Sequence, residues 1–192
     1  MDPTTPRLIL ASASPRRREL LDQIGVAHTI LPAAIPEIPR PGEPPEAYVR
    51  RIAAEKSLAV WEAQDSGLAV LAADTEVVLD GEIFGKPQDS DHAAWMLARL
   101  SGREHRVLSA VSLRAAGQHW EALSISTVAF RILMPAEIAA YWASGEPQGK
   151  AGAYAIQGRG ARFIRHIAGS YSGVMGLPLF ETAELLEKTG FG

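Results

Sequence analysis

The sequence predicts an α/β domain with a mixed, twisted sheet and flanking helices. Short apolar runs of strand length alternate with segments whose apolar residues recur at helical spacing. Turn sequences such as Asp80-Gly81 interrupt this alternation with hairpins, so some neighbouring strands are expected to be antiparallel. A length of 192 residues, with 47% apolar and 21% charged residues, suits one globular domain spanning residues 1–192.

The first third of the chain predicts two strands and two helices. Residues 7–11 form a short apolar run, as in a buried strand. Ser14 is expected as the N-cap of the next helix, Pro15 as its first residue, and Gly25 as its end. A second strand over residues 26–31, a proline-rich extended loop over 32–45 and a helix over about 45–63 should follow.

The remaining elements alternate in the same way. Residues 68–73 are a continuous apolar run, typical of a strand covered on both faces, which Asp74 and Thr75 are expected to end. Residues 77–79 and 82–84 predict a hairpin. Later come a helix over 89–100, antiparallel strands near 105–114 and 119–130, a helix over 135–143, a glycine-rich loop, a strand over 163–168 and a helix over about 179–188.

Composition excludes several classes of site and partner. The chain has no cysteine, so disulfides, thiolate zinc sites and cysteine nucleophiles are excluded. A net charge of −3, with positive charge gathered at residues 16–18, favours a small anionic ligand over a nucleic acid polymer. No apolar run approaches the ~20 residues of a membrane span, and residues 1–7 lack the form of a signal peptide, so a cytoplasmic protein with no membrane partner is expected.

The segment from Ser12 to Arg17 combines a strand end, a turn of small residues and a helix start. Free backbone N–H groups and the helix dipole attract anions at such a point. Two serine hydroxyls and two guanidinium groups gather there, and guanidinium binds phosphate oxygens in a bidentate manner. Ser12, Arg16 and Arg17 are therefore candidate phosphate ligands, and the alternative is a capped helix with solvated arginines.

Asp74 and Thr75 follow an apolar strand, and ligands of open α/β sheets lie beyond the carboxyl ends of strands. A carboxylate there can bind a divalent cation or act as general base toward water. For Asp74 alone, the simpler interpretation is a strand-end cap. Because Ser12 also follows an apolar strand, however, the two residues are expected to share one edge of the sheet.

Four further residues are candidates with simpler structural alternatives. Lys56 and Lys86 are candidate ligands of phosphate groups. The alternative for Lys56 is that its aliphatic stem packs on an apolar face, and the alternative for Lys86 is a solvated residue in a turn. Gln157, which glycine follows, can recognise a base edge or merely satisfy loop backbone groups. Glu37 is a candidate second metal ligand beside Asp74, or a solvated acid.

Four spaced segments of the chain resemble the motifs of the Maf family of nucleoside triphosphate pyrophosphatases. They cover nearly the whole chain in the family's order, which makes the set specific where any one motif would be weak. They are residues 12–21 (SASPRRRELL), residues 73–75 with 81 and 85–87, the set 96–97, 100–102 and 105–107, and residues 150–158 (KAGAYAIQG) continuing to 176–179.

The resemblance implies an inosine-triphosphatase-like fold with two lobes around a central cleft, often as a homodimer. It implies cleavage of a nucleoside triphosphate between its α and β phosphates with a divalent cation, Mg²⁺ or Mn²⁺. By motif position, Asp74 resembles the proton acceptor, and Arg16, Thr75 and Gln157 resemble the residues that set substrate choice. The positions that line the family's phosphate and metal site are Ser12, Arg17, Glu37, Lys56 and Lys86.

The form of residues 156–158 resembles the dTTP/UTP branch, whereas the 7-methyl-GTP branch tends to carry glutamate at the position of Gln157. Modified pyrimidine triphosphates are further candidate substrates. The family is also linked to septum formation and cell-division arrest, so a nucleotide-binding regulator without turnover is an alternative. Glu76 departs from the family resemblance, which implies an apolar residue there. If it points into the cleft, it adds negative charge beside Asp74 and raises the pKa of that residue. Strand alternation is instead expected to turn it away from Thr75, where it is harmless.

Overall fold

The computed structural model describes residues 7–190, and within this range helices pack on one seven-stranded sheet. The strands are β1 (Leu8–Leu10), β2 (His28–Ile30), β3 (Ala69–Leu79), β4 (Glu82–Phe84), β5 (Glu104–Ala115), β6 (Gln118–Phe130) and β7 (Ile164–Ala168). Their spatial order is β2-β1-β3-β5-β6-β7, and β4 pairs with β3 beside this path. β1 is parallel to β2 and β3, and the other pairs are antiparallel, which confirms the predicted α/β class with a mixed sheet.

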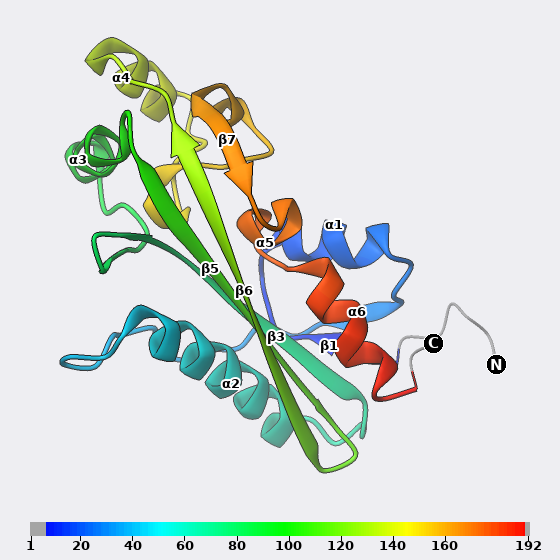
Figure 1. The fold of residues 1–192 in the computed structure, drawn as a ribbon. Coiled ribbons are helices and arrows are strands. Elements are labelled where there is room, and N and C mark those ends of the chain that lie inside the picture. The colour runs from blue at the N-terminus through cyan, green and yellow to red at the C-terminus, as the bar shows by residue number, and fades with distance from the viewer. Residues whose placement is uncertain (1–6, 191–192) are drawn as a thin grey trace.

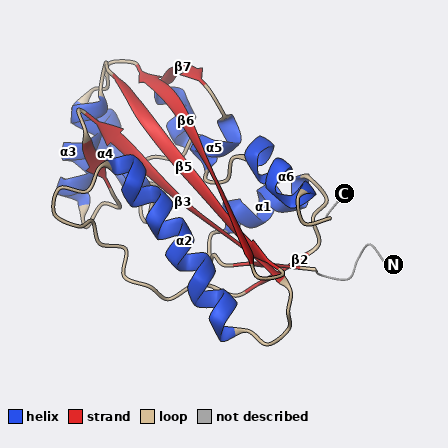
Figure 2. Ribbon diagram, turned by 60° about the horizontal axis from the view of Figure 1, so that its bottom comes forward, coloured by secondary structure: helices blue, strands red, loops and turns tan. Residues whose placement is uncertain are grey.

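Helices cover both faces of this sheet. They are α1 (Pro15–Gln23), α2 (Pro45–Ala63), α3 (Ser90–Leu100), α4 (Pro135–Ala143), α5 (Tyr171–Met175) and α6 (Leu179–Glu187), with the 3-10 segments η1 (Ala151–Ala153) and η2 (Arg159–Phe163). α2 packs on β3 and β5, whereas α1, α5 and α6 lie over the opposite face (Figures 1 and 2). Within residues 7–190, no helix has the length and apolar character that a bilayer crossing requires.

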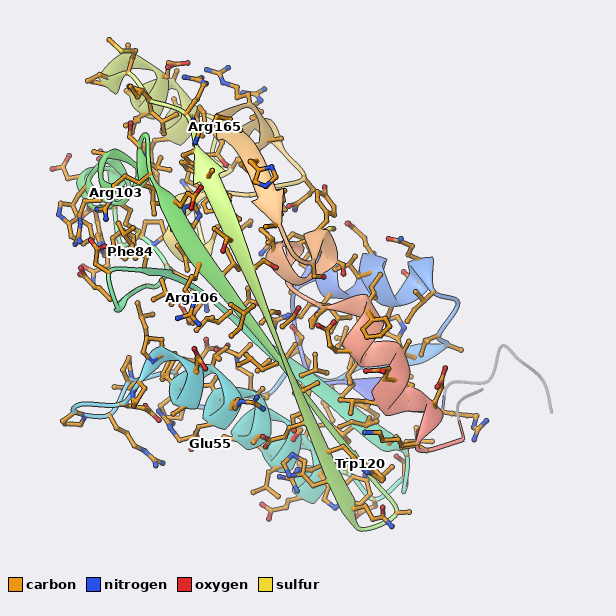
Figure 3. The ribbon with its side chains drawn as sticks, in the orientation of Figure 1. Glu55, Phe84, Arg103, Arg106, Trp120 and Arg165 are labelled. Atoms are coloured by element: carbon orange, nitrogen blue, oxygen red, sulfur yellow. The ribbon has the colours of Figure 1, made fainter. Side chains whose placement is uncertain are left out.

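The two largest apolar clusters of the described residues lie in different lobes of the molecule. One core lies around α3 and α4 and contains Phe84 and Phe130, and the other lies under α1 and α6 and contains Leu21 and Leu113. The long strands β3 and β5 contribute to both cores. Figure 3 shows Phe84 and Trp120 near opposite ends of these strands, and Trp120 packs against the second core. The chain therefore has two lobes that share one continuous sheet.

One predicted strand end is wrong. Asp74 and Thr75 do not end a strand, because β3 runs without interruption from Ala69 to Leu79. Antiparallel β5 pairs with it along this length, with Asp74 opposite Ala110 and Thr75 opposite Ser109. Polar residues are accommodated in mid-strand here because β1 ends at Leu10 and leaves the next part of the β3 edge uncovered by a parallel neighbour. The predicted carboxyl-end site therefore lies beyond β1, and β3 forms its floor.

Candidate active site

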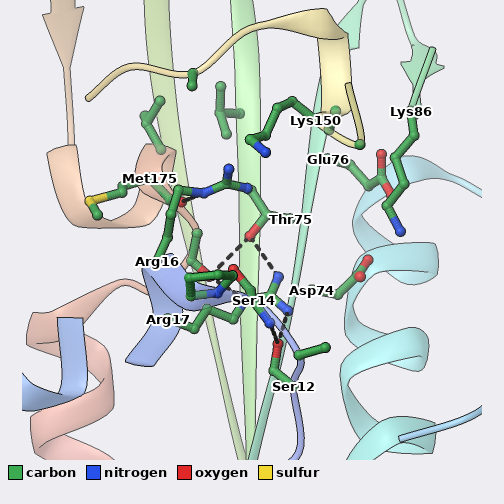
Figure 4. Close-up of a pocket in the computed structure, with 18 of the residues that line it drawn as sticks. Ser12, Ser14, Arg16, Arg17, Asp74, Thr75, Glu76, Lys86, Lys150 and Met175 are labelled. Atoms are coloured by element: carbon green, nitrogen blue, oxygen red, sulfur yellow. Dashed lines mark hydrogen bonds between the residues drawn. The ribbon is translucent and has the colours of Figure 1, made fainter. Parts of the chain in front are cut away.

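A cavity of about 340 Å³ lies between the two lobes. Its lining comes from the segment after β1, from the middle of β3 and from the loop around η1 (Figure 4). The structure brings every predicted site residue to this one cavity, although their roles stay predictions: Ser12, Arg16, Arg17, Glu37, Lys56, Asp74, Thr75, Lys86 and Gln157.

Arg17 ties three parts of the cavity wall together. Its Nε donates to the carbonyl oxygen of Gly176 at 2.8 Å, and its terminal nitrogens donate to the hydroxyls of Ser12 at 3.2 Å and Thr75 at 3.4 Å. Burial lowers the pKa of Arg17, and the nearby charge of Asp74 opposes this effect. Arginine nevertheless stays charged in proteins, so Arg17 is a fixed cation at the base of the cavity.

Arg16 faces the same cavity with fewer constraints. Its Nε donates to the carbonyl oxygen of Met175 at 3.2 Å, and the side chain is partly exposed. Burial, followed by the positive charge of Arg17, lowers the pKa of Arg16. Ser14 occupies the N-cap position of α1 as expected, but its side chain makes no capping hydrogen bond, and its own N–H donates to the Ser12 hydroxyl at 3.2 Å. The two arginines thus leave guanidinium groups at a helix start, where an anion is favoured.

Two lysines and two carboxylates form a connected set on the other side of β3. The Nζ of Lys56 lies 2.9 Å from Asp74 Oδ1 and 3.1 Å from Glu37 Oε1, and the Nζ of Lys86 lies 3.4 Å from Glu37 Oε2. Asp74 is 3% exposed, whereas most of the Lys86 side chain is exposed. Burial raises the pKa of Glu37, but the two lysines outweigh it and leave this pKa below its usual value. Lys56 is therefore a buried ion-pair partner rather than only a packed stem.

Glu76 is not harmless, contrary to the sequence-based expectation. Strand alternation does turn it away from Thr75, but for the same reason it lies on the same face of β3 as Asp74. The side chain is 7% exposed and lines the cavity. Burial, followed by the negative charges of Asp74 and Glu37, raises the pKa of Glu76 well above its usual value. The expectation failed because pointing away from Thr75 was equated with pointing away from the cavity, whereas the alternative of a cleft-facing Glu76 is the one that the structure shows.

The cavity wall opposite β3 is the loop of residues 149–157, and hydrogen bonds from outside the cavity hold this loop in place. The carboxylate of Glu146 accepts hydrogen bonds from the Tyr141 hydroxyl at 2.7 Å and from the N–H groups of Arg159 at 2.8 Å and Gly160 at 3.0 Å. The Tyr141 hydroxyl in turn accepts from the Ala155 N–H at 3.0 Å. These bonds hold both sides of Gln157, whose own side chain is exposed at the cavity.

Glycine is required at one position next to Gln157. A Cβ at Gly158 would lie 2.5 Å from the carboxylate of Glu146, well inside contact distance. The glycine therefore allows the carboxylate to approach the loop backbone closely enough to accept its hydrogen bonds. Gln157 itself is left free to face a ligand.

The carboxylates can hold a divalent cation only together with other ligands. Among residues 7–190 no group of three or more His, Asp or Glu side chains is arranged as a ready metal site. Mg²⁺ in phosphate-handling sites is typically held by one or two carboxylates, substrate oxygens and water. Asp74 Oδ2 is buried and has no hydrogen-bond partner within the described residues, so it fits a cation that arrives with a triphosphate.

Some cavity residues were not identified from the sequence. Lys150 lines the cavity from the loop wall, and burial, followed by the charge of Arg16, lowers its pKa (Figure 4). The carbonyl oxygens of Met175 and Gly176 orient the two arginines. A lysine in a glycine-rich loop was a signal that could have been used, whereas a backbone carbonyl leaves no trace in a sequence.

Known proteins resemble this chain along most of its length. A family model described as "Maf-like protein" matches residues 7–189. A dTTP/UTP pyrophosphatase of Methylococcus capsulatus is 62% identical over 97% of this chain and 92% of that protein. A dTTP/UTP pyrophosphatase of Nitrosomonas europaea is 57% identical over 95% of this chain and 94% of that protein. A solved dITP/XTP pyrophosphatase of Mycobacterium abscessus is 19% identical with a TM-score of 0.40, over 64% of this chain and 72% of that one.

Proposed function

This chain belongs to the Maf-like protein family, and from that premise we propose that it hydrolyses dTTP and UTP to the monophosphate and pyrophosphate. The observation that carries the proposal is the meeting of four cationic side chains with the buried Asp74 in one cavity of about 340 Å³. Such a set neutralises the charge of a triphosphate and leaves one carboxylate for chemistry. The cationic residues are Arg16, Arg17, Lys56 and Lys86.

In this proposal, the guanidinium and ammonium groups bind the phosphate oxygens and hold the α phosphorus beside Asp74. Water attacks that phosphorus, the bond from it to the bridging oxygen breaks, and pyrophosphate leaves. Asp74 is the catalytic residue, either as acceptor of the water's proton or as a cation ligand. A divalent cation, Mg²⁺ or Mn²⁺, supplies Lewis-acid polarisation of the phosphate when bound. Glu37 can act as a second ligand of the cation only when Lys56 and Lys86 leave its carboxylate and bind the phosphate groups.

The base is recognised by the loop wall in this proposal. Gln157 carries both a donor and an acceptor at the cavity rim, which suits the paired edge groups of thymine and uracil. Arg16 and Thr75 contribute to substrate choice from the other wall. Modified pyrimidine triphosphates that keep this edge are candidate substrates as well.

The test is pyrophosphate release with Mg²⁺ from a panel of dTTP, UTP, CTP, GTP and 7-methyl-GTP. We expect turnover of dTTP and UTP to exceed that of every other nucleotide in the panel. Highest turnover of 7-methyl-GTP would assign the chain to that branch instead. Nucleotide binding without pyrophosphate release would identify a nucleotide-binding regulator and overturn the enzymatic proposal.

The proposal extends to the setting in which the enzyme works. The substrate is a small nucleotide, so the cytoplasm, which holds the nucleoside triphosphate pool, is the proposed compartment. A homodimer is the proposed assembly, as the family resemblance implies. Sedimentation velocity at several protein concentrations tests it, and a single species with the mass of one chain would contradict it.

A further inference from the structure

Two carboxylate oxygens in the cavity region are buried without a hydrogen-bond partner among the described residues. They are Oδ2 of Asp74 and Oε2 of Glu76. The two side chains are 3% and 7% exposed, and both line the cavity. Buried polar atoms in folded proteins are nearly always satisfied, and an unsatisfied carboxylate oxygen is especially costly. Two such atoms in one cavity are suited to bind one shared ligand.

The strand geometry brings these two oxygens to the same region. Asp74 and Glu76 are two residues apart in β3, so their side chains leave the same face of the sheet. Figure 4 shows both carboxyl groups on the side of the strand that Lys86 approaches. Lys56 binds the other oxygen of Asp74, Oδ1, and therefore leaves Oδ2 open.

Glu37 differs from both residues because its oxygens are already engaged. Its Oε1 lies 3.1 Å from the Nζ of Lys56, and its Oε2 lies 3.4 Å from the Nζ of Lys86. A cation would have to displace a lysine before it could reach Glu37. The carboxylates with open oxygens are thus Asp74 and Glu76, and not the pair of Asp74 and Glu37 that motif position suggests.

The chemistry of two carboxylate oxygens selects a hard divalent cation as their shared ligand. An anion would be repelled, and a neutral donor would leave Glu76 without a positive charge in direct contact, whereas Asp74 has Lys56 on its other oxygen. Mg²⁺ and Mn²⁺ prefer oxygen ligands, and two carboxylates leave coordination positions for phosphate oxygens and water. The raised pKa of Glu76 reflects the same excess of negative charge, since burial and then Asp74 and Glu37 cause it.

We infer that Asp74 and Glu76 together bind the divalent cation that accompanies the triphosphate, and that Glu37 positions Lys56 and Lys86 instead. This inference rests on the proposed pyrophosphatase function and names a residue that the proposal does not use. It makes Glu76 a cation ligand of this chain. Asp74 then acts primarily as a ligand, with its Oδ2 on the cation and its Oδ1 on Lys56.

The experiment is a titration of Mn²⁺ followed by electron paramagnetic resonance. It is run on the free protein and on protein saturated with the α,β-methylene analogue of dTTP. We expect Glu76→Gln to weaken Mn²⁺ binding at least about tenfold, since even indirect loss of ligand support costs that much. Glu76→Asp keeps the negative charge on a shorter side chain. Its Mn²⁺ affinity should lie between those of the wild type and Glu76→Gln. Glu37→Gln should weaken Mn²⁺ binding less than Glu76→Gln does, because Glu37 contacts the lysines and not the cation.

The matched control is Glu181→Gln. Glu181 in α6 also has an unpartnered carboxylate oxygen, but it does not line the cavity, so its substitution should leave Mn²⁺ binding unchanged. Circular dichroism and the thermal midpoint establish that each variant is folded. Equal Mn²⁺ affinity of wild type and Glu76→Gln in both titrations, or no Mn²⁺ binding by wild type in either, overturns the inference.

The outcomes also separate this inference from the proposed function. If the wild type releases pyrophosphate but Glu76→Gln binds Mn²⁺ normally, the enzymatic proposal stands and the assignment of Glu76 fails. If Glu76→Gln loses Mn²⁺ binding but the wild type releases no pyrophosphate from any nucleotide, the cation site stands and the enzymatic proposal fails.

Discussion

The two walls of the cavity are held in place in different ways. On the sheet wall, charged side chains are fixed by direct contacts with one another, as in the ion pair of Lys56 with Asp74 and the three hydrogen bonds of Arg17. On the loop wall, the backbone of residues 149–157 supplies the surface and is fixed from outside the cavity by Glu146 and Tyr141. The exposed Gln157 contributes a side chain from this wall.

This difference separates chemistry from recognition. Groups that stabilise charge at a reacting phosphate are most effective when the fold holds them in place before the substrate binds. Base recognition needs only a hydrogen-bond donor and an acceptor in the correct position, and a surface loop can present both. Such a loop can also change in sequence during evolution more readily than the sheet can. Substitutions in the sheet wall should therefore lower kcat, whereas those behind the loop wall should alter KM and selectivity.

The largest effect is expected for Asp74→Asn. The amide keeps the shape of the side chain but loses the negative charge that binds a cation or accepts a proton. Pyrophosphate release from dTTP should fall at least about 1,000-fold. Nucleotide affinity, measured by calorimetry with the α,β-methylene analogue, should change by only a few-fold. Turnover near the wild-type rate would remove Asp74 from the chemistry.

A pH effect on stability is expected from His105, which contacts the loop wall through Tyr154. His105 is 3% exposed, its Nε2 lies 2.8 Å from the hydroxyl of Tyr154, and burial lowers its pKa from 6.5 to about 4. Between these two values the unfolded chain binds a proton that the folded chain does not. The free energy of unfolding should therefore be fully retained above pH 6.5 and should fall by about 3 kcal/mol as the pH drops to 4.

Urea denaturation between pH 7 and pH 4 measures this effect. Other groups titrate in the same range, so the informative quantity is the difference between wild type and His105→Phe. Between pH 7 and pH 4, the free energy of unfolding of the variant should fall by about 3 kcal/mol less than that of the wild type. His166→Gln is the control, because His166 is exposed, and it should keep the wild-type slope. If the free energy of unfolding depends on pH in the same way in wild type and His105→Phe, the proposal that His105 is buried in its neutral form is wrong.

Neighbouring arginines should differ in their contribution to stability. Arg17→Met removes hydrogen bonds to Gly176, Ser12 and Thr75, so the free energy of unfolding should fall by about 2 kcal/mol, and kcat should fall as well. Arg16→Met removes one bond, to Met175, so it should cost below about 1 kcal/mol and lower kcat less than Arg17→Met does. Urea titrations and steady-state kinetics on both variants test this, and equal losses of stability would contradict it.

Much of the fold could be predicted because its elements have strong local signals. The helix over residues 45–63 and the turn at Asp80-Gly81 lie where proline, helical spacing and turn residues place them. The end of β3 was misplaced because a strand was expected to stop at its first charged residue. Only the pairing with β5, in which Asp74 lies opposite Ala110, shows that the strand continues. The short helix α5, with Gly173 inside it, carried too little helical signal to be predicted.

Site residues could be predicted as members of one cavity but not as a connected set. The motif around Ser12 and the lysines indicated a phosphate site, and the structure gathers them in one cavity. The contacts of Lys56 with Asp74 and Glu37 join residues 18 and 19 positions away, and no local pattern encodes them. Glu76 was the clearest failure, because period-two alternation already placed it with Asp74, and yet the alternative that it points into the cleft was not favoured.

A smaller effect than that of Arg17→Met is expected at Glu146, which supports the loop wall from outside the cavity. Glu146→Gln replaces one acceptor oxygen with an NH₂ group that faces backbone N–H donors, so part of the support of residues 155–160 is lost. KM for dTTP should rise about tenfold, a change of about 1.4 kcal/mol, while kcat stays within about threefold. The preference for dTTP over dCTP should narrow because Gln157 is held less firmly. Steady-state kinetics on both nucleotides measure this, with the exposed Glu184→Gln in α6 as the control. A fall in kcat at unchanged KM would mean that the loop wall takes part in the chemistry, and the division between the two walls would then be wrong.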